Sequence, residues 1–248
     1  MIKTGRVRIG TSGWVYPEWR KVYYPPGLPH RQELPYLSRR VDTIEINGTF
    51  YGPRKPADFR RWRDLAPDGF VFAVKGPRLV THVRRLRSAE EPVAEFFGSG
   101  VLELGEKLGP ILWQVPASLR FDPEVLGGFL RVLPRDQRHA LEVRHPSFAR
   151  DEVADLLAAH GVALVVSDSP GVWPSLLTDT ADFAYLRLHG DTELYKSAYS
   201  DTALDLWADR VCRWRHERDV YVYFDNTMAA AAPGDAEKLA GRVRAAAA

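Results

Sequence analysis

Phe183-Ala-Tyr-Leu-Arg-Leu-His-Gly-Asp191 has the pattern of a buried β-strand that ends in charged side chains. Alternate residues of a strand share a face, so Tyr185, Arg187 and His189 are predicted to point one way, opposite to Ala184, Leu186 and Leu188. An unpaired charge on the polar face would cost several kcal/mol inside a core. Other segments must therefore bring acidic partners or a ligand to this strand.

Short apolar runs rich in β-formers recur along the chain and mostly alternate with helix-like segments. The eight runs are Val7–Trp14, Thr43–Phe50, Phe70–Pro77, Pro110–Pro116, His139–Pro146, Val162–Ser169, Phe183–Gly190 and Asp219–Thr227. No linker rich in Pro, Gly or Ser and no low-complexity stretch interrupts them before the alanine tail. This pattern predicts one α/β domain over residues 1–248, a (β/α)8 TIM-type barrel.

Helix boundaries carry recognisable signals. Ser88-Ala-Glu-Glu91 has the form of a capping box ahead of a helix over 93–108, and Asp122-Pro123 predicts an N-cap followed by proline at the first helical position. Residues 201–217 form the longest helix pattern, with one apolar face made by Leu204, Trp207, Val211 and Trp214.

The sixth repeat departs from the pattern. Only thirteen residues separate its strand from the next, from Pro170 to Asp182, and Gly171 and Pro174 lie among them. We therefore expect the sixth helix to be irregular or missing, and the segment to form a loop that carries Trp173 over the barrel mouth.

Polar residues end every predicted strand. The carboxyl ends of the strands in such a barrel meet at one face, where the chemistry of this fold is found. The strand-end residues are Thr11, Glu45, Asn47, Lys75, Gln114, Glu142, Arg144, Asp168, Arg187, His189 and Asp225. Eight of these are ionisable, which favours a functional site over a structural ion-pair network, the alternative.

The residue types indicate acid–base chemistry on an anionic or sugar-like small molecule. A carboxylate crowded by others has a raised pKa, so one acid can donate a proton while another accepts one, and His189 can shuttle it. The predicted catalytic residues are Glu45, Glu142, His189 and Asp225. The predicted substrate-binding residues are Trp14, Asn47, Tyr51, Lys75, Gln114, Arg144, Asp168, Arg187 and Asn226. The spacing leaves open which carboxylate is acid and which is base.

Lys75 allows more than one role. Arg144 and Arg187 are suited to bidentate contacts with phosphate or carboxylate, whereas Lys75 could pair with a charged oxygen. If it is desolvated, it could instead act as a base or as a Schiff-base nucleophile.

No cofactor is predicted, and a divalent metal is the alternative. Lys75, Arg144 and Arg187 compete for the carboxylate oxygens that a metal would need. Acids from separate strands could still converge, and the ligands would then be Glu142, Asp168, His189 and Asp225. This alternative describes a metal-dependent phosphodiesterase or endonuclease-like hydrolase.

Charge and composition leave a third hypothesis open. Residues 1–124 hold 20 Lys and Arg against 14 Asp and Glu, whereas the whole chain carries a formal charge of +2. A non-catalytic binder of nucleic acid or nucleotide could use the basic half and an aromatic rim. The absence of an apolar run of membrane-span length, and of a signal-peptide core in residues 1–8, predicts a cytoplasmic protein without membrane contact.

The strand-end motifs resemble those of the YecE-like proteins, called domain of unknown function 72. The matching stretches are Gly10-Thr-Ser-Gly-Trp14 with Tyr16 and Trp19, Glu45-Ile-Asn-Gly-Thr-Phe-Tyr51, Phe72-Ala-Val-Lys75 with Thr81-His82, Gln114-Val-Pro116, Glu142-Val-Arg-His-Pro146, Tyr185-Leu-Arg-Leu-His-Gly190 and Tyr223-Phe-Asp-Asn226. The resemblance implies a TIM-type barrel and no particular activity. Asp191, and Thr227 with the three residues after it, depart from the family pattern, so ligand preference is expected to differ if these positions touch ligand.

Overall fold

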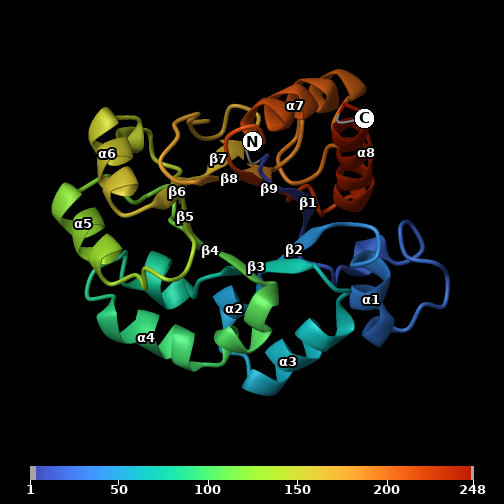
Figure 1. Ribbon diagram of the computed structural model, residues 1–248, viewed down its shortest axis with the longest axis horizontal. Coiled ribbons are helices and arrows are strands. Elements are labelled where there is room, and N and C mark those ends of the chain that lie inside the picture. The colour runs from blue at the N-terminus through green and yellow to red at the C-terminus, as the bar shows by residue number, and fades with distance from the viewer. Residues whose placement is uncertain (1–3, 247–248) are drawn as a thin grey trace.

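The computed structural model describes residues 4–246, and parallel strands form its centre. The strands are β1 Val7–Ser12, β2 Thr43–Ile46, β3 Val71–Lys75, β4 Leu108–Gln114, β5 His139–Glu142, β6 Val162–Leu164, β7 Val166–Asp168, β8 Phe183–Leu188 and β9 Asp219–Phe224. They form one sheet in the order β6-β5-β4-β3-β2-β1-β9-β8-β7. Figure 1 shows helices in an outer ring around these strands.

The sheet closes through a strand that is split in two. β6 pairs with β5, whereas β7 pairs with β8, and only Val165 separates β6 from β7. The backbone N–H of Val165 donates to the carbonyl oxygen of Leu141 at 2.9 Å. The eight predicted runs are therefore all strands, and the sixth is divided between its two neighbours, which makes nine strands of a TIM-type barrel.

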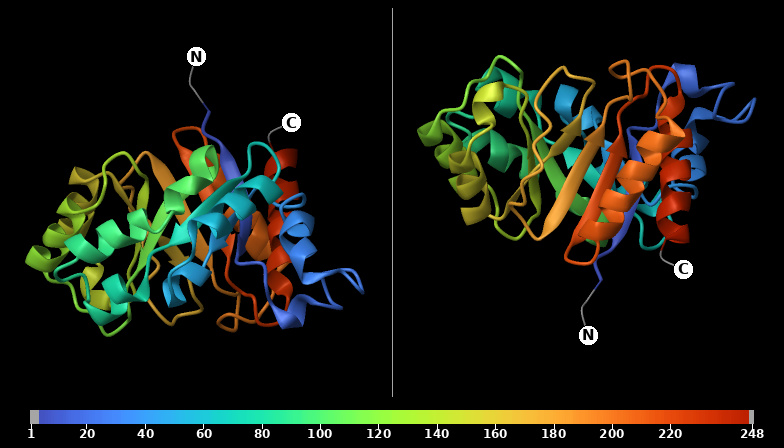
Figure 2. Two further views of the ribbon diagram at one scale, coloured as in Figure 1. Left: turned by 90° about the horizontal axis from the view of Figure 1, so that it is seen from below. Right: turned by 90° about the horizontal axis from the view of Figure 1, so that it is seen from above.

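The α-helices are α1 Glu33–Leu37, α2 Gly48–Tyr51, α3 Pro56–Leu65, α4 Glu90–Gly98, α5 Pro123–Arg131, α6 Asp151–Ala159, α7 Asp201–Trp214 and α8 Ala231–Ala245. Residues 169–182 hold no helix, so the irregular sixth repeat is confirmed. Figure 2 shows the strands running from one end of the barrel to the other with helices along their flanks. No helix in the part of the chain that the structure describes is both long and apolar enough to cross a membrane.

Of the two predicted helix caps, the one at Asp122 is confirmed and the one at Ser88 is not. Asp122 caps α5 because its side chain accepts from the backbone N–H groups of Glu124 and Val125. The capping box at Ser88 is wrong: Ala89 is the N-cap of α4 and no side chain caps it. Gly100, with φ of 106°, ends this segment early and a separate 3₁₀ turn, Val101–Lys107, follows.

Two apolar clusters fill the barrel wall and its interior. The larger one packs between the strands and the helices and includes Ala184, Leu186 and Leu188. The smaller one fills the barrel and includes Tyr185, Ala163 and Val165. The predicted alternation of residues 184–188 is therefore confirmed, and the interior cluster defines which residues of each strand point inward.

Candidate functional site

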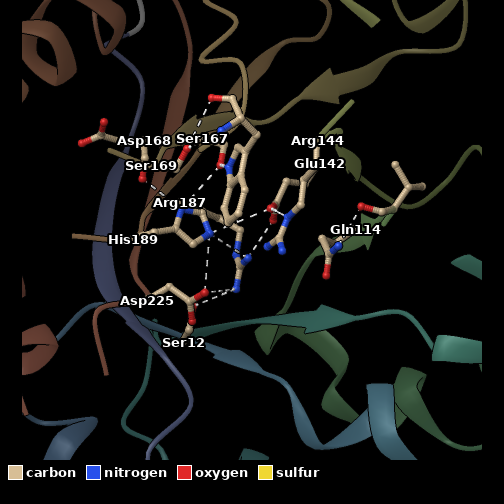
Figure 3. A network of polar contacts seen from close by, with 12 residues as sticks. Ser12, Gln114, Glu142, Arg144, Ser167, Asp168, Ser169, Arg187, His189 and Asp225 are labelled. Atoms are coloured by element: carbon tan, nitrogen blue, oxygen red, sulfur yellow. Dashed lines mark hydrogen bonds and ion pairs between the residues drawn. The ribbon is translucent and has the colours of Figure 1, made fainter. Parts of the chain in front are cut away.

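Arg187 of β8 is the centre of a buried polar cluster (Figure 3). Its side chain is 1% exposed, and its guanidinium contacts carboxylates from three other segments. Nη2 lies 2.8 Å from Oε1 of Glu45 and 3.1 Å from Oδ2 of Asp225, while Nη1 lies 2.7 Å from Oε2 of Glu142. The sequence predicted that this strand needs acidic partners, and the structure provides three carboxylates.

Short hydrogen bonds complete the cluster. Tyr185 donates its hydroxyl to Oε2 of Glu45 at 2.7 Å, and Ser12 donates to Oε1 of the same residue at 3.1 Å. Nε of Arg144 donates to Oε1 of Glu142 at 2.7 Å. Burial opposes ionisation of Glu142, but Arg144 and Arg187 outweigh it and hold the pKa of this carboxyl well below its ordinary value. Glu142 is therefore ionised, and Arg144 and Arg187 neutralise its charge.

His189 lies next to Arg187 as a neutral ring. Burial lowers its pKa below the usual value of a histidine, against the opposing effect of Glu142. Nδ1 lies 3.0 Å from the carbonyl oxygen of Asp168, which fits an N–H donor there, and Nε2 lies 3.2 Å from Nη1 of Arg187 and 3.5 Å from Oδ2 of Asp225. The arrangement assigns the proton to Nδ1 and leaves Nε2 as an acceptor.

A pocket of about 1030 Å³ opens above this cluster at the carboxyl ends of the strands. Asp225 is the only carboxylate among the described residues that line it, whereas six basic side chains do so: Arg31, Arg54, Arg61, Lys75, Arg144 and Arg187. Glu45, Glu142 and His189 are buried beneath the wall and do not line it. The pocket surface is therefore strongly basic, and its counter-charges are hidden.

The floor and wall of the pocket combine cations with rings. The guanidinium of Arg144 lies 4.1 Å from the ring centroid of Trp173, and Nζ of Lys75 lies 4.3 Å from that of Phe50. Trp173 also meets the ring of His189 edge-on, with the two ring centroids 5.4 Å apart. The loop 169–182 thus brings Trp173 against Arg144 and His189, but Trp173 does not line the pocket, so the prediction that it lies over the mouth is not confirmed. The remaining predicted binding residues on the pocket wall are Trp14, Asn47, Tyr51 and Gln114.

Two predicted site residues point away from the pocket. The carboxylate of Asp168 accepts from the hydroxyl of Tyr199 at 2.8 Å and from the indole N–H of Trp207 at 3.3 Å, on the α7 side of the strand. Asn226 is fully buried and donates to Asp235 at 2.8 Å, beneath α8. Asp168 and Asn226 were predicted to bind substrate at the mouth of the barrel. Neither lines the pocket, so both predictions are wrong about where the side chain lies.

The four ligands of the metal alternative are not brought together in this structure. Because Asp168 is turned outward, the set Glu142, Asp168, His189 and Asp225 is not assembled at the mouth. Guanidinium nitrogens of Arg187 and Arg144 occupy the oxygens of Glu142. Within residues 4–246 no group of three or more His, Cys, Asp or Glu side chains is placed to hold a metal ion. The residues present do not fit a metal centre.

Several residues of the cluster and of the pocket were not among the predicted site residues. Ser12, rather than Thr11, faces the cluster, and Ser167 of β7 accepts from the indole of Trp173 at 2.6 Å. His82 lines the pocket from a π-helical turn, Leu79–Val83, and burial together with Lys75 lowers its pKa to about 4. The available signal was the stretch Thr81-His82, which the resemblance to the YecE-like proteins includes.

The two departures from the family pattern have different positions. Thr227 lines the pocket, and its carbonyl oxygen accepts from the indole of Trp19 at 2.9 Å. Asp191 does not line the pocket, because its carboxylate accepts from the backbone N–H of Ser200 before α7. Of these two residues, only Thr227 is placed to touch a ligand in the pocket.

Comparisons with known proteins identify relatives of the whole chain. The sequence pattern of the family described as "Protein of unknown function DUF72" matches residues 8–248. The chain is 26% identical over 254 residues to the UPF0759 protein YecE of Escherichia coli strain K12, which covers 92% of this chain and 89% of that protein. A solved structure of a DUF72 family protein from Thermotoga maritima is similar with a TM-score of 0.86 and 29% identity, covering 96% and 99% of the two chains. One from Enterococcus faecalis, 18% identical, shares the fold with a TM-score of 0.82 over 96% and 95% of the chains.

Proposed function

The chain belongs to DUF72, a family of proteins of unknown function, and from its pocket we propose that it is a metal-independent enzyme acting on a small phosphorylated or sugar-like substrate. The proposed reaction is an acid–base hydrolysis or isomerisation at the carboxyl ends of the barrel strands. The substrate binds through its anionic group, and its reacting part lies near Asp225.

The charge distribution around the pocket carries this proposal. Six basic side chains and one carboxylate line it, while the other two carboxylates of the cluster are bonded by Arg187 below the surface. Four of the six basic side chains form no ion pair within the described residues: Arg31, Arg54, Arg61 and Lys75. An entering anion therefore meets positive charge that the protein has not neutralised. Arg144 is well placed to bind it, because Trp173 and Glu142 fix its guanidinium plane while its Nη atoms remain available.

Proton transfer is assigned to Asp225. Its side chain is 14% exposed and is the one carboxylate that reaches the pocket in the described part of the chain. Nε2 of the neutral His189 lies 3.5 Å behind it, so a proton taken up by Asp225 can be shared with the imidazole. Glu45 and Glu142, predicted as catalytic, are better suited to hold Arg187 in place than to touch a substrate.

A turnover screen with a matched variant tests the proposal. Purified protein treated with a chelator is incubated with a panel of sugar phosphates and phosphate esters, and products are followed by mass spectrometry and phosphate release. Asp225→Asn keeps the size of the side chain and should lower turnover of an active substrate by about 100-fold or more, in the range of a lost acid–base group. Arg135→Gln, on an exposed side chain, should leave it unchanged.

The outcome of this screen is decisive in two ways. Equal turnover by the wild type and Asp225→Asn contradicts the assigned role of Asp225. Turnover that appears only after a divalent metal is added contradicts the metal-independent mechanism.

A second candidate is binding of a nucleotide or nucleic acid without catalysis. Arg31, Arg54 and Arg61 extend the basic surface to the outer part of the pocket, where Trp14 and Trp62 meet edge-on at 5.5 Å. Such a ligand would bind with an affinity that falls steeply with salt, by roughly one logarithmic unit per phosphate contact for each tenfold rise in salt. Fluorescence anisotropy of a labelled oligonucleotide between low and high salt distinguishes this candidate from a small-molecule enzyme.

A further inference from the structure

Lys75 differs from Arg144 and Arg187, the two arginines at the buried cluster, in having no acidic partner in the part of the chain that the structure describes. Within the described residues its Nζ makes no hydrogen bond and no ion pair, and its recorded contact is the face of the Phe50 ring at 4.3 Å. By contrast, Arg187 contacts three carboxylates and Arg144 contacts one. The amine therefore lines the pocket and, within residues 4–246, forms no polar contact that holds the fold together.

The surrounding cluster explains why no carboxylate reaches Lys75. Glu45 and Glu142 are both bonded by Arg187, and Oε1 of Glu142 is bonded in addition by Arg144. Asp225 is held 3.1 Å from Arg187. The amine of Lys75 lies close enough to feel these charges, but their oxygens are directed to guanidinium groups.

This environment favours the neutral amine. Burial and the positive charge of Arg187 lower the pKa of Lys75 to about 8, against the opposing effects of the three acids. A lysine with that pKa has a neutral fraction of about one tenth at pH 7, compared with less than one thousandth for a lysine of ordinary pKa near 10.4. Only the neutral amine carries the lone pair that attacks an electrophile.

We propose that Lys75 forms an imine with a carbonyl group of the substrate, so that the substrate class is phosphorylated aldehydes and ketones. The inference rests on the proposed function, since it assigns the phosphate to the basic wall of the same pocket. It adds a covalent step and a substrate class to that function.

The step balances within the pocket. The lone pair of Nζ forms a bond to the carbonyl carbon and the carbon–oxygen π bond breaks; the oxygen gains one proton and the nitrogen loses one, which gives a neutral carbinolamine. A second proton on that oxygen lets it leave as water while the nitrogen lone pair forms the carbon–nitrogen double bond of the protonated imine. Asp225 and Tyr195 line the same pocket and are the groups that can exchange these protons. No oxidant or reductant is required.

Reductive trapping tests the imine at the level of one residue. The protein is mixed with glycolaldehyde phosphate and sodium cyanoborohydride, and peptide mass spectrometry follows the modification of each lysine with time. Lys75 should be modified at least tenfold faster than Lys238, an exposed lysine of α8, and its rate should rise with pH through about 8. Glycolaldehyde, which lacks the phosphate, should remove most of this advantage.

Lys75→Arg is the matched variant, because it keeps the positive charge but cannot form an imine. It should bind inorganic phosphate as the wild type does in calorimetry and show only the slow labelling of the surface lysines. Phosphate binding together with Lys75 labelling no faster than Lys238 overturns the imine and leaves the anion site intact. Rapid labelling of Lys75 that inorganic phosphate does not slow, with no phosphate binding, overturns the anion site instead.

Discussion

Arg187 connects the acids of the cluster, and its guanidinium is the reason that three carboxylates can lie together in the barrel. Glu45 and Glu142 are fully buried, and the side chain of Asp225 is 14% exposed. Each contact joins a charge-assisted donor to an ionised acceptor at 2.7 to 3.1 Å. Removing the guanidinium would leave negative charges without this partner, two of them on the fully buried Glu45 and Glu142.

We therefore predict that Arg187→Met destabilises the protein by about 3–5 kcal/mol, the usual effect of removing one partner from a buried ion pair. Urea unfolding followed by tryptophan fluorescence measures the free energy of unfolding. Arg135→Gln, on the exposed surface, should change it by no more than about 0.5 kcal/mol. A loss below about 1 kcal/mol in Arg187→Met would show that the carboxylates are not held by this residue.

At the scale of single elements, the alternation of residues along each strand decides which predictions succeed. Phe183–Leu188 alternates polar and apolar side chains, and Tyr185 and Arg187 were correctly assigned to the interior. The run Val162-Ala-Leu-Val-Val-Ser-Asp168 is apolar on both faces and gives no such signal. Ala163 and Val165 pack inside the barrel, so every second residue from them also points inward. Ser167 therefore faces the interior and Asp168 faces outward.

The sequence thus predicts the barrel, the missing helix and most of the strand-end residues, because these follow from local patterns. It does not predict which strand-end residues reach the pocket surface. The alternation of the sequence assigns Glu142 and Arg144 to one face, but β5 ends at Glu142, which is buried, and Arg144 lies beyond the strand and lines the pocket. That difference depends on Arg187 and Trp173, which come from other segments.

The contrast between two helix starts provides a prediction at this scale. Asp122→Ala should cost about 1 kcal/mol of stability, because it removes the side-chain acceptor for two backbone N–H groups of α5. Ser88→Ala, at the position that the sequence marks as a cap of α4, should change stability by less than about 0.5 kcal/mol, since its side chain caps nothing. Chemical denaturation of both variants measures the difference. Equal losses would contradict the assigned helix ends.

At the scale of the whole molecule, the barrel separates buried, neutralised charge from exposed positive charge. Four of the six basic pocket residues, Arg31, Arg54, Arg61 and Lys75, come from the first half of the chain, which holds the excess of Lys and Arg. The strand ends bring Arg144 and Arg187 beside them from the second half. The uneven charge of the two halves therefore becomes a basic pocket at one end of the barrel.

The most direct test of this account is the affinity of inorganic phosphate, measured by isothermal titration calorimetry at low salt. The variant is Arg144→Met, which removes the guanidinium proposed to bind the anion, and its control is Arg135→Met, on an exposed side chain. We predict binding to the wild type and to Arg135→Met with equal affinity, and a loss of about tenfold or more in Arg144→Met, because a hydrogen bond to a charged group contributes roughly 1.5–3 kcal/mol. No binding to the wild type, or equal binding by all three proteins, would contradict the claim that this pocket is an anion site.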